Sequence, residues 1–271
     1  MTPRVERRFG FLPDYPKRLL ERGAFNRVDT LRGYNSGEYS YFVTDPENNG
    51  LSREEFSSNF ERFYGKYLLQ RHAHDFLSQF IYREYLGSNT NPISIRSNLV
   101  TAFADTGFGL GSVLEAQKML EHGGAGSNHF VYEMDYQNSL SNHPTWMGVI
   151  HAEELPLVFM STFPVPSIFL NQADRVMGEK VQTMWTNFVK TGNPVATQVV
   201  ENGVDVRWNK YTLTNPIILK IDVRSSEVPF PRPASLRAYD EFLNVLQETS
   251  PAESSSTTSS YNLAGNTPVL G

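Results

Sequence analysis

The segments of this chain that favour β-strands are few and far apart, and helical segments lie between them. The stretches 28–34, 129–136 and 215–223 have the apolar patterns of strands. Strands that alternate with helices favour an α/β layer architecture. Three strands are few for 271 residues, so the sequence predicts an incomplete sheet flanked by helices.

Helices are predicted from apolar spacing and from start and stop signals. Ser52 and Glu55 have the spacing of a capping box, which predicts a helix from about Arg53. The stretch 173–191 has the clearest apolar face and is followed by Gly192. The other predicted helices cover 17–22, 73–85, 95–103, 112–121 and 235–247. A break is expected between 95–103 and 112–121, at the glycine-spaced "DTGFGLG".

The last part of the chain differs in composition from the rest. Residues 248–271 are rich in Ser and Thr and are expected to be disordered. The folded domain is therefore predicted to span residues 1–247.

Composition argues against several classes of function. The net charge is -5 and no cluster of Lys and Arg occurs, which argues against a nucleic-acid partner. There is no cysteine, so disulfides, thiolate nucleophiles and Cys-based zinc sites are excluded. The H-E-x-x-H spacing and phosphate-binding glycine loops are absent, so no metal or cofactor site is predicted. No apolar run approaches the roughly 18 residues of a transmembrane helix.

Two further absences bear on the compartment. The first thirty residues lack the apolar region of a signal peptide, and no Asn-x-Ser/Thr acceptor occurs. Together with the lack of cysteine, they favour a reducing compartment such as the cytoplasm.

A histidine and a glutamate each follow a predicted strand. His151 comes after the strand over 129–136, and Glu38 lies in the turn after the strand over 28–34. A lone histidine at such a place is more often structural than catalytic. A carboxylate and an imidazole that follow separate strands of one sheet can, however, form the acid and base of a catalytic triad.

The segments around these two residues resemble the C-terminal half of the type B carboxylesterase/cholinesterase family, which includes the neuroligins. "GYNSGEYSYF" (33–42) is similar to the family turn G-x-N-x-x-E-G-S-x-F, with Glu38 at the triad acid. "WMGVIHAEELPLVF" (146–159) is similar to W-M-G-V-x-H-G-x-E-L/I-x-x-V-F, with His151 at the triad histidine. "MWTNFVKTGNP" (184–194) matches a third family segment, and the resemblance spans about residues 9–247.

The resemblance implies an α/β-hydrolase fold and hydrolysis of carboxylic esters through an acyl-enzyme and without a cofactor; choline esters are among the candidate substrates. It places Glu154 at a buried family glutamate near the site; the alternative is a loop carboxylate at a helix start. It makes the helix over 235–247 similar to a dimerisation helix, which would support a homodimer; packing on its own domain is the alternative. The family is secreted or lies at the cell surface, so the compartment stays open.

The resemblance does not supply a nucleophile. The family serine lies in an N-terminal half, and no G-x-S-x-G occurs in this sequence. We therefore expect this chain alone to lack esterase activity, to be a fragment or a truncated relative, and to fold poorly with exposed sheet edges. A non-enzymatic, neuroligin-like adhesion protein is the alternative function, since such relatives can keep the acid and the histidine.

Three departures from the family pattern stand near the site. Tyr39 and Ala152 replace family glycines, and "DTGFG" (105–109) stands where a half-cystine would fall. Tyr39 is the bulkiest change, and it is expected to disturb the geometry of Glu38.

Overall fold

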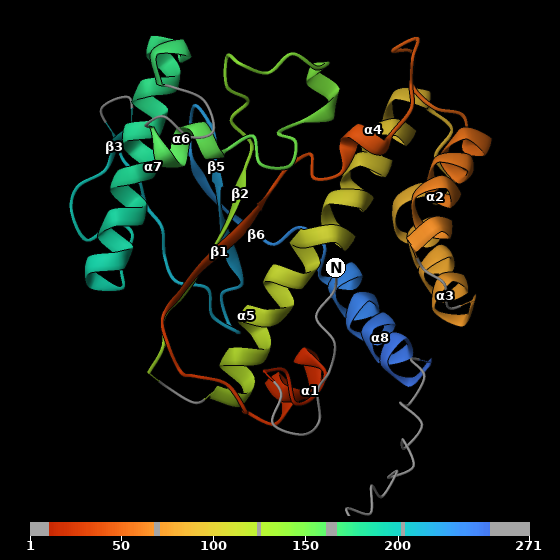
Figure 1. Cartoon of the computed structure of the whole chain (residues 1–271), viewed down its shortest axis with the longest axis horizontal. Coiled ribbons are helices and arrows are strands. Elements are labelled where there is room, and N and C mark those ends of the chain that lie inside the picture. Colours follow the sequence, from red (N-terminus) through yellow and green to blue (C-terminus); the bar gives the residue numbers. More distant parts are fainter. Residues whose placement is uncertain (1–10, 68–70, 124–125, 161–166, 202–203, 250–271) are drawn as a thin grey trace, which may run out of the picture.

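A four-stranded sheet forms the centre of the computed structural model, which describes residues 11–67, 71–123, 126–160, 167–201 and 204–249 (Figure 1). The strand order is β1 (Thr30–Asn35), β2 (His129–Met134), β5 (Ile217–Ile221) and β6 (Ser226–Pro229). The first three strands are parallel, and β6 is antiparallel to β5. This arrangement confirms the predicted incomplete α/β sheet flanked by helices.

The two faces of the sheet are covered by different helices. In Figure 1, α7 (Gln172–Thr191) lies on one side of the sheet and α5 (Leu110–Gly123) on the other. Because side chains alternate along a strand, Phe130 and Met134 of β2 join the cluster that contains α7 residues, whereas Val131 joins the cluster on the α5 side. The sheet therefore separates two apolar cores.

Most of the predicted helices are present. The Ser52 backbone N–H donates to the Glu55 carboxylate at 2.7 Å, and the Glu55 N–H donates to Ser52 Oγ at 3.1 Å, which confirms the capping box. The other helices are α1 (Pro16–Glu21), α2 (Arg53–Tyr67), α3 (Arg71–Ile81), α4 (Pro92–Ala104), α6 (Leu155–Phe159) and α8 (Pro233–Thr249). Shorter elements are the turns η1 (Ser40–Phe42), η2 (Tyr82–Leu86), η3 (Asp105–Gly109), η4 (Thr145–Met147) and η5 (Ser167–Phe169), and the hairpin β3 (Val200–Glu201) and β4 (Val204–Asp205).

The break expected at "DTGFGLG" does not occur, and that prediction was wrong. The π-helical turn η3 joins α4 to α5 without interruption. Asp105 at its start is fully buried and accepts hydrogen bonds from Tyr85 Oη and from Arg232, each at 2.7 Å. These tertiary contacts outweigh the low helix propensity of the glycines.

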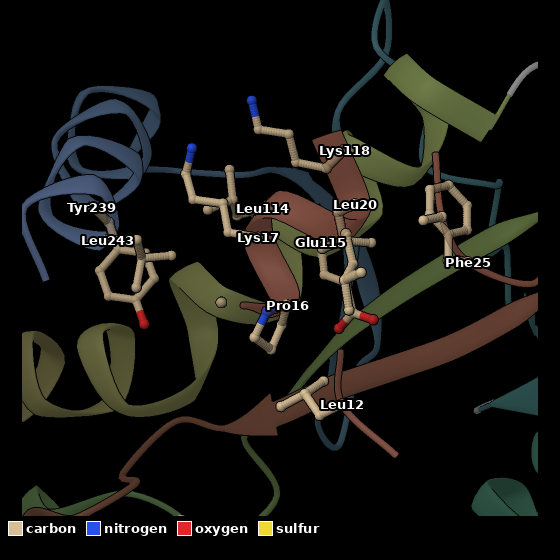
Figure 2. Close-up of a pocket in the computed structure, with 13 residues that line it drawn as sticks. Leu12, Pro16, Lys17, Leu20, Phe25, Leu114, Glu115, Lys118, Tyr239 and Leu243 are labelled. Carbon is tan, nitrogen blue, oxygen red and sulfur yellow. The ribbon is translucent and has the colours of Figure 1, made fainter. Parts of the chain in front are cut away.

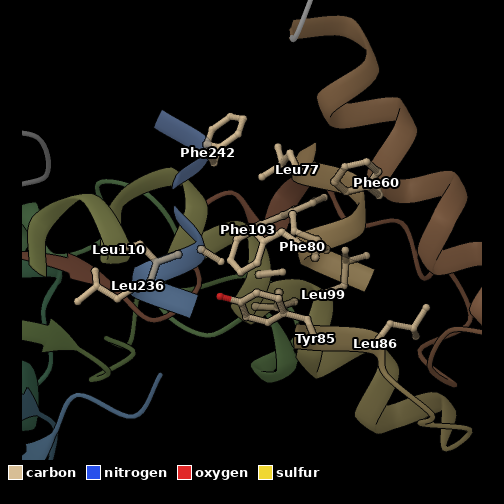
Figure 3. Close-up of a cluster of buried hydrophobic side chains, with 14 of the residues drawn as sticks. Phe60, Leu77, Phe80, Tyr85, Leu86, Leu99, Phe103, Leu110, Leu236 and Phe242 are labelled. Atoms are coloured by element: carbon tan, nitrogen blue, oxygen red, sulfur yellow. The ribbon is translucent and has the colours of Figure 1, made fainter. Parts of the chain in front are cut away.

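The last helix, α8, packs within its own domain. The rings of Phe76 from α3 and Phe242 from α8 stack with centroids 6.4 Å apart, and Leu236 and Phe242 belong to the buried cluster that is drawn in part in Figure 3. Dimerisation through 235–247 stays a prediction. The helix reaches Thr249, two residues into the predicted tail, and residues 250–271 lie outside the described residues. None of the described helices is long and apolar enough to cross a lipid bilayer.

Candidate active site

The turn after β1 places Glu38 against His151, although the two residues are far apart in sequence. His151 Nδ1 lies 2.7 Å from Glu38 Oε2. Glu38 is 4% exposed, whereas the His151 side chain is 49% exposed. The structure therefore brings together the two residues predicted as triad acid and histidine, with the carboxylate inside and the imidazole at the surface.

The environment of the Glu38 carboxyl group shifts the pKa of this residue. Burial raises the pKa of Glu38, and the hydrogen bonds from His151 and from the Asn35 N–H offset part of this effect. The nearby charge of Glu154 acts in the same direction as burial. An ionised Glu38 accepts from Nδ1–H and so leaves Nε2 of a neutral His151 as the proton acceptor.

Asn35, the last residue of β1, links the parts of the site. Its backbone N–H donates to Glu38 Oε1 at 3.1 Å, and its side-chain amide donates to Glu154 Oε2 at 2.6 Å and to the carbonyl of Ile150 at 2.9 Å. Glu154 thus contacts Asn35, whose backbone N–H binds Glu38. Asn35 was not among the predicted site residues, although it stands at the fixed asparagine of the quoted turn pattern.

Gly37 allows the turn after β1 to approach the histidine segment closely. Its N–H donates to the carbonyl of Val149 at 2.9 Å. A Cβ atom at position 37 would lie 1.8 Å from the carbonyl oxygen of Met147. A side chain of any size would therefore push the two segments apart.

The residues that follow Glu38 and His151 both have left-handed backbones. Tyr39 has a φ of 60° and Ala152 a φ of 66°. This conformation costs an L-residue about 1–2 kcal/mol, which explains why the family pattern has glycine at both positions. Tyr39 was expected to disturb the geometry of Glu38. No such disturbance is observed: the Glu38–His151 bond is short. Gly107 makes room, since a Cβ there would lie 2.5 Å from a ring carbon of Tyr39.

A second glutamate–histidine pair lies beside the first. His143 Nε2 is 3.2 Å from both carboxylate oxygens of Glu153, which also accepts from Ser141 Oγ and from the Ile150 N–H. The contact between His143 and Glu153 was not predicted from the sequence. The pair and His151 border a cavity of about 220 Å³, whose lining is Asn138, Leu140, Ser141, Asn142, His143, Ile150, His151, Ala152, Glu153 and Pro156.

An ion pair anchors the start of the histidine segment. Arg96 is paired with Asp45, and both side chains are buried. The guanidinium group lies over the Trp146 ring at 4.6 Å, and Trp146 Nε1 donates to Asn48 Oδ1 at 2.7 Å. Burial opposes ionisation of Asp45, but the bonds from Arg96 and from the Gly50 N–H outweigh it, so the pKa of Asp45 is lowered.

Other features of the described residues lie apart from this site. A cavity of about 380 Å³ between α1, α5 and α8 is lined largely by apolar side chains, with Lys17, Glu115 and Lys118 among them (Figure 2). Neither Glu38 nor His151 lines it. Within the described ranges, no three His, Asp or Glu side chains gather in a group that could hold a metal ion.

Comparisons with known proteins agree with the sequence pattern. The model of the Carboxylesterase family matches residues 1–237. Neuroligin-3 of Mus musculus is 28% identical over 232 residues, which are 79% of this chain and 28% of that protein. The medium-chain fatty acyl-CoA hydrolase precursor of Anas platyrhynchos is 25% identical over 229 residues (80% and 40%), and cocaine esterase of Homo sapiens is 27% identical over 194 residues (68% and 33%).

The chain spans less than half of the length of each of these relatives. The family match, in contrast, covers most of this chain and includes both the turn of Glu38 and the segment of His151. The chain therefore belongs to the carboxylesterase family.

Proposed function

We propose that this chain supplies the acid and the base of a serine carboxylic ester hydrolase, with Glu38 as the acid and His151 as the base. The observation that carries the proposal is the 2.7 Å hydrogen bond between a buried carboxylate and a half-exposed imidazole. Glu154 serves as a supporting residue, because it holds the Asn35 amide next to Glu38.

The geometry fits acyl transfer by a serine. His151 Nε2 takes the proton of the serine hydroxyl as its oxygen attacks the ester carbonyl, and it then gives this proton to the leaving alcohol. Water later enters by the same route and releases the acid from the acyl-enzyme. Throughout, the Glu38 carboxylate holds the imidazole in one tautomer and stabilises the imidazolium. No cofactor takes part in these steps.

The serine is proposed to come from outside these 271 residues, because the sequence contains no G-x-S-x-G. Among the described strands, β1 pairs on one side only, with β2. A further strand could pair with its open edge and bring a nucleophile towards His151. On this proposal, the chain alone has no esterase activity.

The substrate is proposed to be a carboxylic ester. Two of the relatives are named as a fatty acyl-CoA hydrolase and a cocaine esterase. Choline esters belong to the same chemical class. A second candidate function, a non-enzymatic adhesion protein like the neuroligins, is favoured by the similarity to neuroligin-3.

The test uses the protein encoded by the complete reading frame that contains this chain. We expect it to hydrolyse p-nitrophenyl butyrate and to be labelled by a fluorophosphonate probe at one serine. His151→Ala should lower kcat about 10³-fold or more. His72→Ala, at an exposed histidine of α3, is the matched control and should leave kcat unchanged. A folded protein that neither hydrolyses the ester nor takes the label would overturn the proposal and favour the adhesion protein.

A further inference from the structure

Two aromatic rings from separate elements lie near the His151 imidazole and roughly parallel to it. The Phe108 ring of η3 is 5.1 Å from the imidazole, centroid to centroid, with 27° between the planes. The Tyr39 ring is 6.3 Å away with 25° between the planes. The two rings are also 5.2 Å from each other. We call Tyr39 and Phe108 the aromatic wall.

The rest of the fold holds the aromatic wall in place. Tyr39 packs on Phe63 with centroids 5.2 Å apart, and its ring occupies the space that Gly107 leaves open. Phe108 is only partly buried, so burial in a core does not account for its position. It belongs to a π-helical turn that is tied down by the buried Asp105. Such turns occur often at functional sites.

We propose that Phe108 and Tyr39 are positioning residues for His151, an inference that rests on the proposed function. Flat packing limits rotation of the imidazole, so that Nδ1 stays within reach of the Glu38 carboxylate. The electron-rich face of Phe108, whose centroid is 5.1 Å away, also favours the imidazolium that forms when Nε2 takes the serine proton. Glu38 therefore stabilises this cation from the ring edge, and Phe108 stabilises it from the ring face.

The activity test compares substitutions of Phe108 in the protein from the complete reading frame. Phe108→Leu keeps an apolar side chain but removes the π face, and it should lower kcat about 3- to 30-fold with a smaller change in KM. Phe108→Tyr restores the π face and should restore most of kcat. Phe76→Leu, at a partly buried phenylalanine between α3 and α8, is the matched control and should change neither constant.

A second readout does not depend on hydrolysis. In protein labelled with ¹³C-histidine, the carbon-bound ring protons of His151, identified by their loss in His151→Gln, should resonate upfield because of the aromatic ring currents. Phe108→Leu should move them downfield, and Phe108→Tyr and Phe76→Leu should not. Tyr39→Leu should give a smaller downfield movement, and it provides the test if Phe108→Leu does not fold.

The two proposals fail in different ways. If His151→Ala abolishes hydrolysis while Phe108→Leu moves neither the resonances nor kcat, the aromatic wall has no positioning role and the inference is overturned. If the protein hydrolyses no ester but the resonances move as expected, the proposed function fails, while the contact between the aromatic wall and His151 stands.

Discussion

The two neighbouring glutamate–histidine pairs contain the same side chains but are built differently. In the pair of Glu38 and His151, the carboxylate is buried and the imidazole is half exposed. In the pair of Glu153 and His143, the side chains are 8% and 10% exposed. The first pair thus leaves its imidazole open to solvent, whereas the second keeps both members inside.

Hydrogen bonding separates the pairs further. Glu153 binds Ser141, His143 and the backbone of Ile150 at once, and so it ties the loop after β2 to the histidine segment. His151 uses Nδ1 for Glu38, and the described residues provide no hydrogen-bond acceptor or donor for its Nε2. A glutamate–histidine contact therefore indicates a candidate acid–base pair only where one ring nitrogen has no hydrogen-bond partner in the protein.

The largest expected effect comes from replacing the two glutamates one at a time. In the complete protein, Glu38→Gln should lower kcat roughly 10³- to 10⁴-fold, because an amide no longer stabilises the imidazolium or fixes its tautomer. Glu153→Gln should keep kcat within about tenfold and instead lower the free energy of unfolding by about 1–3 kcal/mol. Ester hydrolysis and urea unfolding check both values. Equal losses of kcat in the two variants would remove the distinction between the pairs.

The next largest effect is expected from a substitution in the ion pair that supports the segment of both glutamate–histidine pairs. Asp45→Asn leaves the buried Arg96 without its counter-charge, and Arg96 supports Trp146 at the start of the histidine segment. The free energy of unfolding should fall by about 3–5 kcal/mol. Glu47→Gln replaces an exposed carboxylate two residues away and should change it by less than about 0.5 kcal/mol. Urea unfolding of both variants is the measurement, and a loss as small as that of the control would contradict the anchoring role.

A smaller effect is expected at the backbone of the first pair. Ala152→Gly relieves the left-handed strain next to His151, while glycine adds entropy to the unfolded chain, so the net gain in stability should be about 0.5–1 kcal/mol. Ala173→Gly, in the first turn of α7, should instead lower stability by up to about 1 kcal/mol. Thermal or urea unfolding distinguishes the two signs. A loss of stability in Ala152→Gly would show that the φ of Ala152 carries no strain.

The smallest expected effect is a dependence of stability on pH that comes from Glu38. Its pKa is raised by burial above the ordinary value of 4.5, so the folded protein holds this proton more tightly than the unfolded chain. The contribution of Glu38 to stability is therefore fully present below pH 4.5 and is lost as the pH rises through the folded-state pKa. Unfolding measured across this window should show the decline in the wild type and less of it in Glu38→Gln. Parallel curves would contradict the raised pKa.

Several parts of the fold and site were accessible from local sequence. The capping box of Ser52 and Glu55, the helix of residues 173–191 and the three parallel strands follow from patterns within one segment. The pairing of Glu38 with His151 came from two quoted motifs, and the distance between them agrees with it. These features depend on neighbouring residues or on a turn whose sequence allows few conformations.

Other parts were missed because they depend on contacts between distant segments. The π-helical turn at 105–109 was predicted as a break, since the glycines were visible but the bonds from Tyr85 and Arg232 to Asp105 were not. Strand β6, which pairs with the preceding strand β5, and the partner of His143, Glu153, were also missed, although both contacts are between neighbouring segments. The bulk of Tyr39 was expected to disturb Glu38, because its accommodation depends on Gly107, which lies on a different element.

The sequence by itself determined the family, the choice of Glu38 and His151 as the proposed acid and base, and the absence of a G-x-S-x-G elbow, because each depends on a run of adjacent residues. Only the tertiary structure decided which glutamate–histidine pair keeps a ring nitrogen available, and which aromatic rings lie against it. Burial and ring stacking arise where separate segments of the chain come together in the fold. No local pattern of residue types predicts these contacts, so they are seen only in the folded structure.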